Sequence, residues 1–206
     1  MRVLILLLLA ATIAVPLTSW SQQDADPAGL DDPQEPVEFL SLAAVLIGDG
    51  NYQRARNALA RVDTRAEEVD LARYHTLAGL VALNLDELPL AATEFEAAID
   101  AGQSDPVVRL YLAQAYFGQG RYDETLEQLA QAGDEATRVP SIFLMRAQAH
   151  WALKDYAAAW HVLGEGRAEF PDRAGDFARR QVFLLVDQGL YQEAADQGLQ
   201  YLESGL

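Results

Sequence analysis

The sequence lacks cysteine altogether, and Lys154 is its single lysine. Without cysteine the chain can form no disulfide, no thiolate zinc site and no thiol nucleophile. It also has no cysteine to acylate at a mature N-terminus, which excludes a bacterial-type lipoprotein.

Positive charge is scarce as well, since 31 acidic side chains face 15 basic ones and the formal net charge is −16. A field of this sign repels nucleic-acid phosphates and anionic lipid headgroups. We therefore expect no nucleic-acid partner and no direct membrane binding by the mature domain. The acidity also serves to keep an exported protein soluble. Half of the residues are hydrophobic, so the chain can build a sizeable core.

Residues 1–21, MRVLILLLLAATIAVPLTSWS, have the layout of a secretory signal peptide. Arg2 supplies a basic start, and the apolar run over residues 3–15 ends at Pro16. Ser19 and Ser21 then place small residues before a cleavage point. The run is shorter than the roughly 20 apolar residues that span a bilayer. The pattern favours export to a bacterial periplasm; an uncleaved inner-membrane anchor stays open as the alternative.

Residues 22–36, QQDADPAGLDDPQEP, contain five acidic residues and three prolines and no aromatic residue. This composition cannot bury enough apolar surface to offset the entropy lost on ordering. We expect a flexible acidic linker, with an acidic interaction tail as the alternative.

From residue 37 onward the sequence repeats itself. A small residue recurs at intervals of 36, 34, 34 and 35, at Ala55, Ala91, Thr125, Ala159 and Ala194. Four residues later a large apolar side chain stands at Leu59, Phe95, Leu129 and Leu163, with Gly198 departing in the fifth unit. Upstream, a small residue stands at Ala43, Gly79, Ala113 and Ala147, with Val182 in the fifth unit. Apolar residues within each unit follow the helical period, so each unit is predicted to be two antiparallel helices.

These residues resemble the tetratricopeptide repeat (TPR). The residues that carry the resemblance are Leu112, Ala113 and Tyr116 in the third unit, Gly79, Ala91, Phe95 and Ala98 in the second, and Ala147, Ala159 and Pro171 in the fourth. His75 and His150 depart from the pattern, at its tryptophan and tyrosine positions. The resemblance implies an all-α, right-handed superhelical α-solenoid of about five helix–turn–helix repeats. Its units are 37–70, 71–105, 106–139, 140–173 and 174–206.

No motif in the chain points to catalysis. Gly118-Gln119-Gly120 lacks a preceding strand and the other residues of a phosphate loop, and it falls at the turn between two repeat helices. The matching Gly50 and Gly189 indicate that Gly120 closes a helix in a left-handed cap. GEGR, residues 164–167, falls inside a predicted helix, and the three histidines have no metal-ligand spacing. We expect no enzyme, no cofactor and no metal.

The resemblance places certain side chains of each first helix in a concave groove. These predicted partner-binding residues are Arg73, Thr76, Leu80, Leu83, Leu110, Gln114, Phe117, Leu144, Gln148, Trp151, Arg179, Phe183 and Asp187. Aromatic and amide side chains at equivalent places suit a peptide or helix. Whether Phe117 and Trp151 line the groove or fill the core between repeats stays open at this point. Thr76 and Leu110 stand where some relatives carry a carboxylate-binding cation, so recognition of an acidic chaperone-type tail is not expected.

The predicted last helix ends in apolar residues without a polar capping helix. Leu199, Tyr201 and Leu202 are expected to form an apolar end face that meets a partner, a second copy or further repeats. The sequence thus predicts a non-catalytic protein-interaction scaffold of the bacterial envelope. The alternative is a structural or accessory subunit whose repeats mainly oligomerise or support an enzyme or transport machine.

Overall fold

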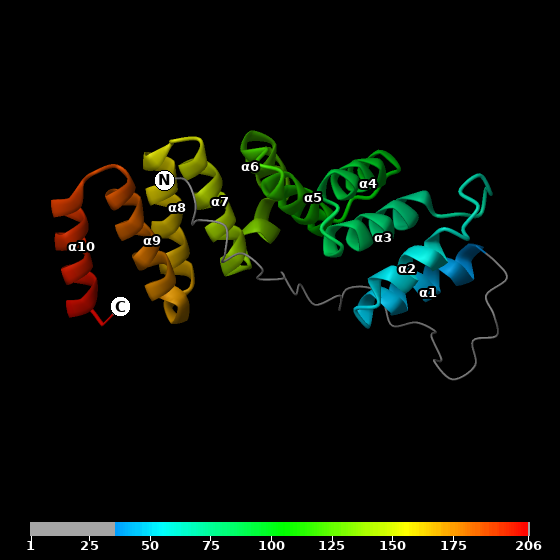
Figure 1. The fold of residues 1–206 in the computed structure, drawn as a ribbon, viewed down its shortest axis with the longest axis horizontal. Coiled ribbons are helices and arrows are strands. Elements are labelled where there is room, and N and C mark those ends of the chain that lie inside the picture. The colour runs from blue at the N-terminus through cyan, green and yellow to red at the C-terminus, as the bar shows by residue number, and fades with distance from the viewer. Residues whose placement is uncertain (1–35, 206) are drawn as a thin grey trace. The chain divides into compact units, whose positions relative to one another are not determined.

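The computed structural model describes residues 36–205, and within them ten α-helices form five consecutive antiparallel pairs (Figure 1). The pairs are α1 (Pro36–Gly48) with α2 (Tyr52–Leu59), α3 (Leu71–Asn84) with α4 (Leu88–Asp100), α5 (Pro106–Gly118) with α6 (Tyr122–Gln131), α7 (Pro140–Ala152) with α8 (Tyr156–Glu169), and α9 (Ala174–Asp187) with α10 (Tyr191–Glu203). Two short 3-10 helices lie at Gly133–Thr137 and Pro171–Arg173.

The pairs stack in chain order. Each helix packs against its partner, and the second helix of a pair packs against the first helix of the next, as α4 does on α5, α6 on α7 and α8 on α9. Stacking is required because a single helix pair cannot bury its own apolar faces. The prediction of an all-α array of helix–turn–helix units is confirmed.

The turn inside each pair has one backbone conformation in all five copies. One residue per turn has a positive φ: Gly50 (73°), Asp86 (60°), Gly120 (74°), Lys154 (64°) and Gly189 (77°). Each donates its N–H to a carbonyl three residues back, and the next residue donates to a carbonyl five residues back. This is the Schellman-type C-cap, which ends the first helix and reverses the chain.

The two glycines of the Gly118-Gln119-Gly120 motif have different structural roles. Gly120 occupies the left-handed position of the cap, which confirms its predicted part in the turn. Gly118 is the last residue of α5, and a Cβ there would lie 2.5 Å from Cδ1 of Leu88 on α4. Gly118 therefore allows two neighbouring pairs to approach closely.

The recurring small and large residues pack against each other inside the pairs. The ring of Phe95 on α4 is fully buried against Gly79 of α3, where an added Cβ would lie 2.6 Å from the ring. Ala55, Ala91 and Ala159 are completely buried at equivalent places on the second helices. These contacts explain why the repeat requires a small residue at these positions.

Three of the helices begin directly after an aspartate whose side chain caps the helix N-terminus. Asp105 and Asp155 accept hydrogen bonds from the backbone N–H of Val107 (2.9 Å) and Ala158 (3.1 Å). Asp70 caps α3 in the same way, accepting from the N–H of Arg73 at 2.9 Å. Each such cap satisfies an N–H group that the first helical turn would leave unpaired.

The predictions for the signal peptide and for nearly all of the acidic linker concern residues 1–35, which lie outside the described residues. Within residues 36–205, no helix has both the length and the apolar character needed to cross a membrane.

Candidate functional site

The predicted groove residues divide into buried and accessible groups. Four of them, Thr76, Leu80, Leu110 and Leu144, are buried and offer no surface to a partner. Leu80 and Leu144 belong to the hydrophobic clusters, and the hydroxyl of Thr76 donates to the carbonyl of Ala72 at 2.7 Å. The resemblance places these positions in the groove, whereas their burial places them in the core.

The accessible group lies on the first helices, where Gln114, Gln148 and Phe183 occupy one line of equivalent positions and Leu83, Phe117 and Trp151 occupy a second. Gln114, Phe117, Gln148 and Trp151 on α5 and α7 are half-buried, as are Arg73 and Leu83 on α3, whereas Arg179, Phe183 and Asp187 on α9 are exposed. Phe183 is the most accessible large apolar residue of the set, at 60%.

The two glutamines of this line carry free amides. Gln114 and Gln148 occupy equivalent positions, and within residues 36–205 neither side chain makes a hydrogen bond. A carboxamide offers two N–H donors and one acceptor oxygen, which match the groups of a peptide backbone. The amides are therefore available to a partner.

The aromatic residues beside these amides each touch another part of the array. The ring of Phe117 packs edge-on against Tyr122, with 5.6 Å between centroids. Nε1 of Trp151 donates to Asp187 on α9 at 2.8 Å and so links two consecutive pairs. Both rings thus combine a packing role with a partly accessible surface.

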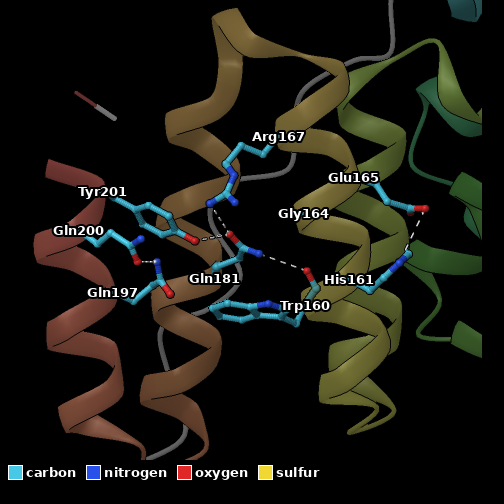
Figure 2. Close-up of a pocket in the computed structure, with 9 residues that line it drawn as sticks. All are labelled: Trp160, His161, Gly164, Glu165, Arg167, Gln181, Gln197, Gln200 and Tyr201. Carbon is cyan, nitrogen blue, oxygen red and sulfur yellow. Dashed lines mark hydrogen bonds and ion pairs between the residues drawn. The ribbon is translucent and has the colours of Figure 1, made fainter. Parts of the chain in front are cut away.

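A cleft of about 490 Å³ lies between α8, α9 and α10, and the sequence did not predict it (Figure 2). Gln181 of α9 lies at its centre and is only 1% exposed. Its oxygen accepts from Arg167 (3.2 Å) and Tyr201 (2.5 Å), and its amide donates to the carbonyl of Trp160 (3.2 Å). Because three hydrogen bonds satisfy it, Gln181 is a structural residue of the last two pairs.

The GEGR segment lies beside this cleft and has a packing role. A Cβ at Gly166 would lie 2.4 Å from the ring of Phe177 on α9, so α8 and α9 approach closely there. Gly164 faces Gln181, and Arg167 lies over the ring of Tyr201 at 5.0 Å. These contacts show that the GEGR residues serve the packing of α8 against α9 and α10. A search for phosphate-loop motifs does not detect such a packing role.

The last pair also exposes large apolar residues. Phe183 and Val186 of α9 and Tyr191, Leu199 and Leu202 of α10 are all exposed. The prediction that Tyr201 belongs to the apolar end face is wrong. Tyr201 is only 8% exposed, and its hydroxyl points inward and donates to Gln181. It lies seven residues, or two helical turns, from the buried Ala194 and thus on the core side of α10.

The titratable side chains are dispersed. His75 contacts Glu94 at 2.8 Å, His150 lies 3.6 Å from Asp155, and His161 is exposed on α8. Burial lowers the pKa of His150. Within the described residues, no three His, Asp or Glu side chains are grouped so that they could hold a metal ion.

The most perturbed tyrosine has a structural role between pairs. Burial, followed by a hydrogen bond to Glu96, raises the pKa of Tyr116 to about 12. The guanidinium of Arg121 lies 4.0 Å above its ring. Tyr116 therefore stays protonated at neutral pH and holds α5 against α4.

No protein-family model matches the chain, and no curated protein matches it in sequence. Solved structures do match its fold. A MamA structure from AMB-1 has a TM-score of 0.68 at 15% identity, covering 82% of this chain and 97% of MamA. MamA 41-end from Desulfovibrio magneticus RS-1 has a TM-score of 0.70 at 13% identity, covering 83% and 95%.

A third similar structure is pilF from Pseudomonas aeruginosa, with a TM-score of 0.58 at 19% identity, covering 79% of this chain and 72% of pilF. At these identities the likeness is one of fold. It supports the assignment of the helix pairs to the TPR-type fold.

Proposed function

We propose that the chain is a non-catalytic scaffold that binds a peptide or helix of a partner protein along α5, α7 and α9. The partner belongs to a multiprotein complex of the bacterial envelope. The observation that carries the proposal is the pair of free amides at Gln114 and Gln148, flanked by Phe117 and Trp151 and followed by the exposed Phe183. Amides can pair with a peptide backbone while aromatic rings bury apolar area with little loss of entropy.

The net negative charge of the chain disfavours some classes of partner. With 31 acidic and 15 basic residues, the chain repels nucleic acid and anionic membrane surfaces. The proposal therefore assigns a protein partner, and it assigns no nucleic acid, cofactor or direct membrane contact to the mature domain.

The binding surface is tested by capture from an envelope extract. We expect Gln114→Ala with Gln148→Ala, and separately Phe117→Ala with Trp151→Ala, to reduce recovery of the partner about tenfold or more. Leu90→Ala is the matched control, because Leu90 is 46% exposed on α4, away from this line. Unchanged recovery by both double variants, with unchanged helicity, would defeat the proposal.

Export is a separate part of the proposal and rests on the pattern of residues 1–21. We expect the cellular protein to begin at Gln22 and to fractionate with the periplasm. The intact mass of the protein purified from the periplasmic fraction shows whether the chain begins at Gln22. A chain that retains residues 1–21 and fractionates with the inner membrane would favour the anchored alternative.

The exposed apolar residues of α9 and α10 favour one second candidate, an accessory subunit that self-associates through its last pair. Sedimentation of the purified mature chain over a range of concentrations distinguishes the peptide-binding scaffold from the self-associating subunit. A concentration-dependent dimer that Leu199→Glu abolishes would support the accessory subunit.

A further inference from the structure

We propose that α10 binds an amphipathic helix of another protein, which docks as the first helix of a following pair would. The inference rests on the proposed function and adds a second contact site with a partner of defined chemistry. The surface is a stripe along α10, named here the terminal stripe, and consists of Tyr191, Ala195, Leu199 and Leu202. Their spacing of four, four and three residues places them on one helical face.

The repeat shows what this face does elsewhere in the chain. On α8 the equivalent positions are Tyr156, Trp160, Gly164 and Arg167. The carbonyl of Trp160 and the guanidinium of Arg167 both hydrogen bond with Gln181 of α9, at 3.2 Å each. On α4 the residue equivalent to Tyr191 is Leu88, which lies against Gly118 of α5.

The same face is uncovered on α10. Tyr191, Leu199 and Leu202 are 69%, 59% and 72% exposed. Within residues 36–205 no helix lies against them, whereas α4, α6 and α8 each pack against the next first helix. A contiguous apolar face of this kind marks a protein-interaction site.

The size of the stripe residues defines the complementary helix. Leu199 of α10 replaces Gly164 of α8, so α10 projects further than α8 at this place, and Leu202 presents an apolar side chain where α8 has Arg167. A docking helix can approach closely only if it carries a small residue where α9 carries Gln181. We therefore infer alanine or glycine at the centre of the partner helix.

Charge defines the flank of the partner helix. The sequence of α10 contains Glu193, Asp196 and Glu203 and no basic residue. Helical spacing places Asp196 and Glu203 along one side of the terminal stripe. Lysine or arginine on the matching side of the partner helix would complement them, and the attraction would weaken with salt.

A second copy of the chain fits this surface less well. Each copy carries a net charge of −16, so two copies repel each other. The first helix that a second copy could offer is α1, which has Glu38 at the position where α5, α7 and α9 have Val108, Ile142 and Phe177. Those three residues are buried, and placing a carboxylate there would be costly.

The proposal is tested by photocrosslinking with the full chain in its native cells. Leu199 is replaced by p-benzoylphenylalanine, and the same replacement at Leu90 on α4 is the control, because both leucines are exposed. We expect a Leu199 adduct with another protein, and we expect the crosslinked peptide, identified by mass spectrometry, to come from an amphipathic segment with basic residues on one side. Leu199→Glu combined with Leu202→Glu should reduce co-purification of that protein about tenfold or more.

Three results would overturn the proposal. They are an adduct at twice the mass of the chain, an adduct at Leu199 no stronger than at Leu90, and a crosslinked segment without helical amphipathicity or basic residues. The groove variants keep the two sites distinguishable. If Gln114→Ala with Gln148→Ala abolishes capture and the α10 double variant does not, the proposed function stands and this inference fails.

Discussion

The pair α3–α4 and the pair α9–α10 share the same turn geometry and fill the space between their helices in opposite ways. In α3–α4 the small residue is Gly79 on the first helix, and the large one is Phe95 on the second. In α9–α10 the position of Gly79 is Val182, and the position of Phe95 is Gly198. The volume missing at Gly198 is supplied by Tyr201, which replaces Ala98.

The last pair also replaces an apolar centre with a polar one. Gln181 stands at the position of Ala78, and its hydrogen bonds to Tyr201, Arg167 and the carbonyl of Trp160 satisfy the buried amide. The comparison teaches that the stack conserves the filling of space and the pairing of buried polar groups. The position in the repeat that supplies the large side chain or the polar group differs between the two pairs.

The largest expected effect comes from alanine at the two glycines of this comparison. Gly79→Ala should destabilise the chain by about 1–3 kcal/mol, because its Cβ would lie 2.6 Å from the buried Phe95 ring. Gly198→Ala should stabilise it by up to about 1 kcal/mol, because nothing lies within 4 Å and alanine favours the helix. Urea unfolding followed by circular dichroism measures both. If both substitutions changed the free energy of unfolding in the same direction, the two pairs would not fill their centres in opposite ways.

The next effect tests the polar centre of the last pair. Tyr201→Phe should cost about 1 kcal/mol because Gln181 loses a buried hydrogen bond. In a double-mutant cycle with Gln181→Leu, we expect a coupling of similar size. Tyr111→Phe, on a ring that stacks on Phe95 at 5.7 Å, is the control and should change stability by less than about 0.5 kcal/mol. Absence of coupling would show that Tyr201 acts by volume alone.

The turns of the two pairs give effects of the same size or smaller. Gly189 of the last pair has φ +77°, so Gly189→Ala should cost about 1 kcal/mol. Asp86 holds the same place in α3–α4 at φ 60°, and Asp86→Gly should stabilise by about 0.5 kcal/mol or less, because aspartate tolerates this region. Thermal unfolding of the two variants checks the opposite signs. A destabilising Asp86→Gly would indicate that the carboxylate has a local role.

The smallest effect is the pH dependence that Asp176 contributes in the last pair. Hydrogen bonds from Arg173 and Arg179 lower the pKa of Asp176 below its usual value of 3.8. A lowered folded pKa gives stability that is complete above the unfolded pKa and is lost as the pH falls through the folded pKa. The loss should amount to a few tenths of a kcal/mol, because the carboxylate is 25% exposed.

The variant Asp176→Asn isolates this contribution. It should lose less stability than the unaltered chain when the pH falls from about 5 to about 3, since asparagine does not titrate. Amide hydrogen exchange in α9 measures the difference. An equal loss in both chains would assign the acid sensitivity to other carboxylates.

The sequence was sufficient for the helical array because its signals are local and repeat. The small residue at Ala55 and its four equivalents, the aspartate caps and the turn glycines each specify a helix or its end within a few residues. Asp86 and Lys154 were not recognised as turn residues, because they occupy the left-handed cap position without the glycine that signals it in a sequence.

The candidate surface was predicted less completely. Alignment could place Gln114, Gln148 and Phe183 on one line of the first helices, and they are accessible. It also placed Leu80 and Leu144 there, although they belong to the core. Accessibility depends on how neighbouring helices cover a position, and such contacts join residues far apart in the sequence.

By itself, the sequence determined the helix pairs, their turns and the predominance of acidic charge, because propensity, capping and net charge are properties of short segments or of composition. Only the tertiary structure decided that Tyr201 turns inward to Gln181, that Gln114 and Gln148 keep free amides, and that Tyr191, Leu199 and Leu202 stay uncovered. The physical reason is that burial and hydrogen bonding are settled between helices, where the neighbour that covers a side chain belongs to another part of the chain.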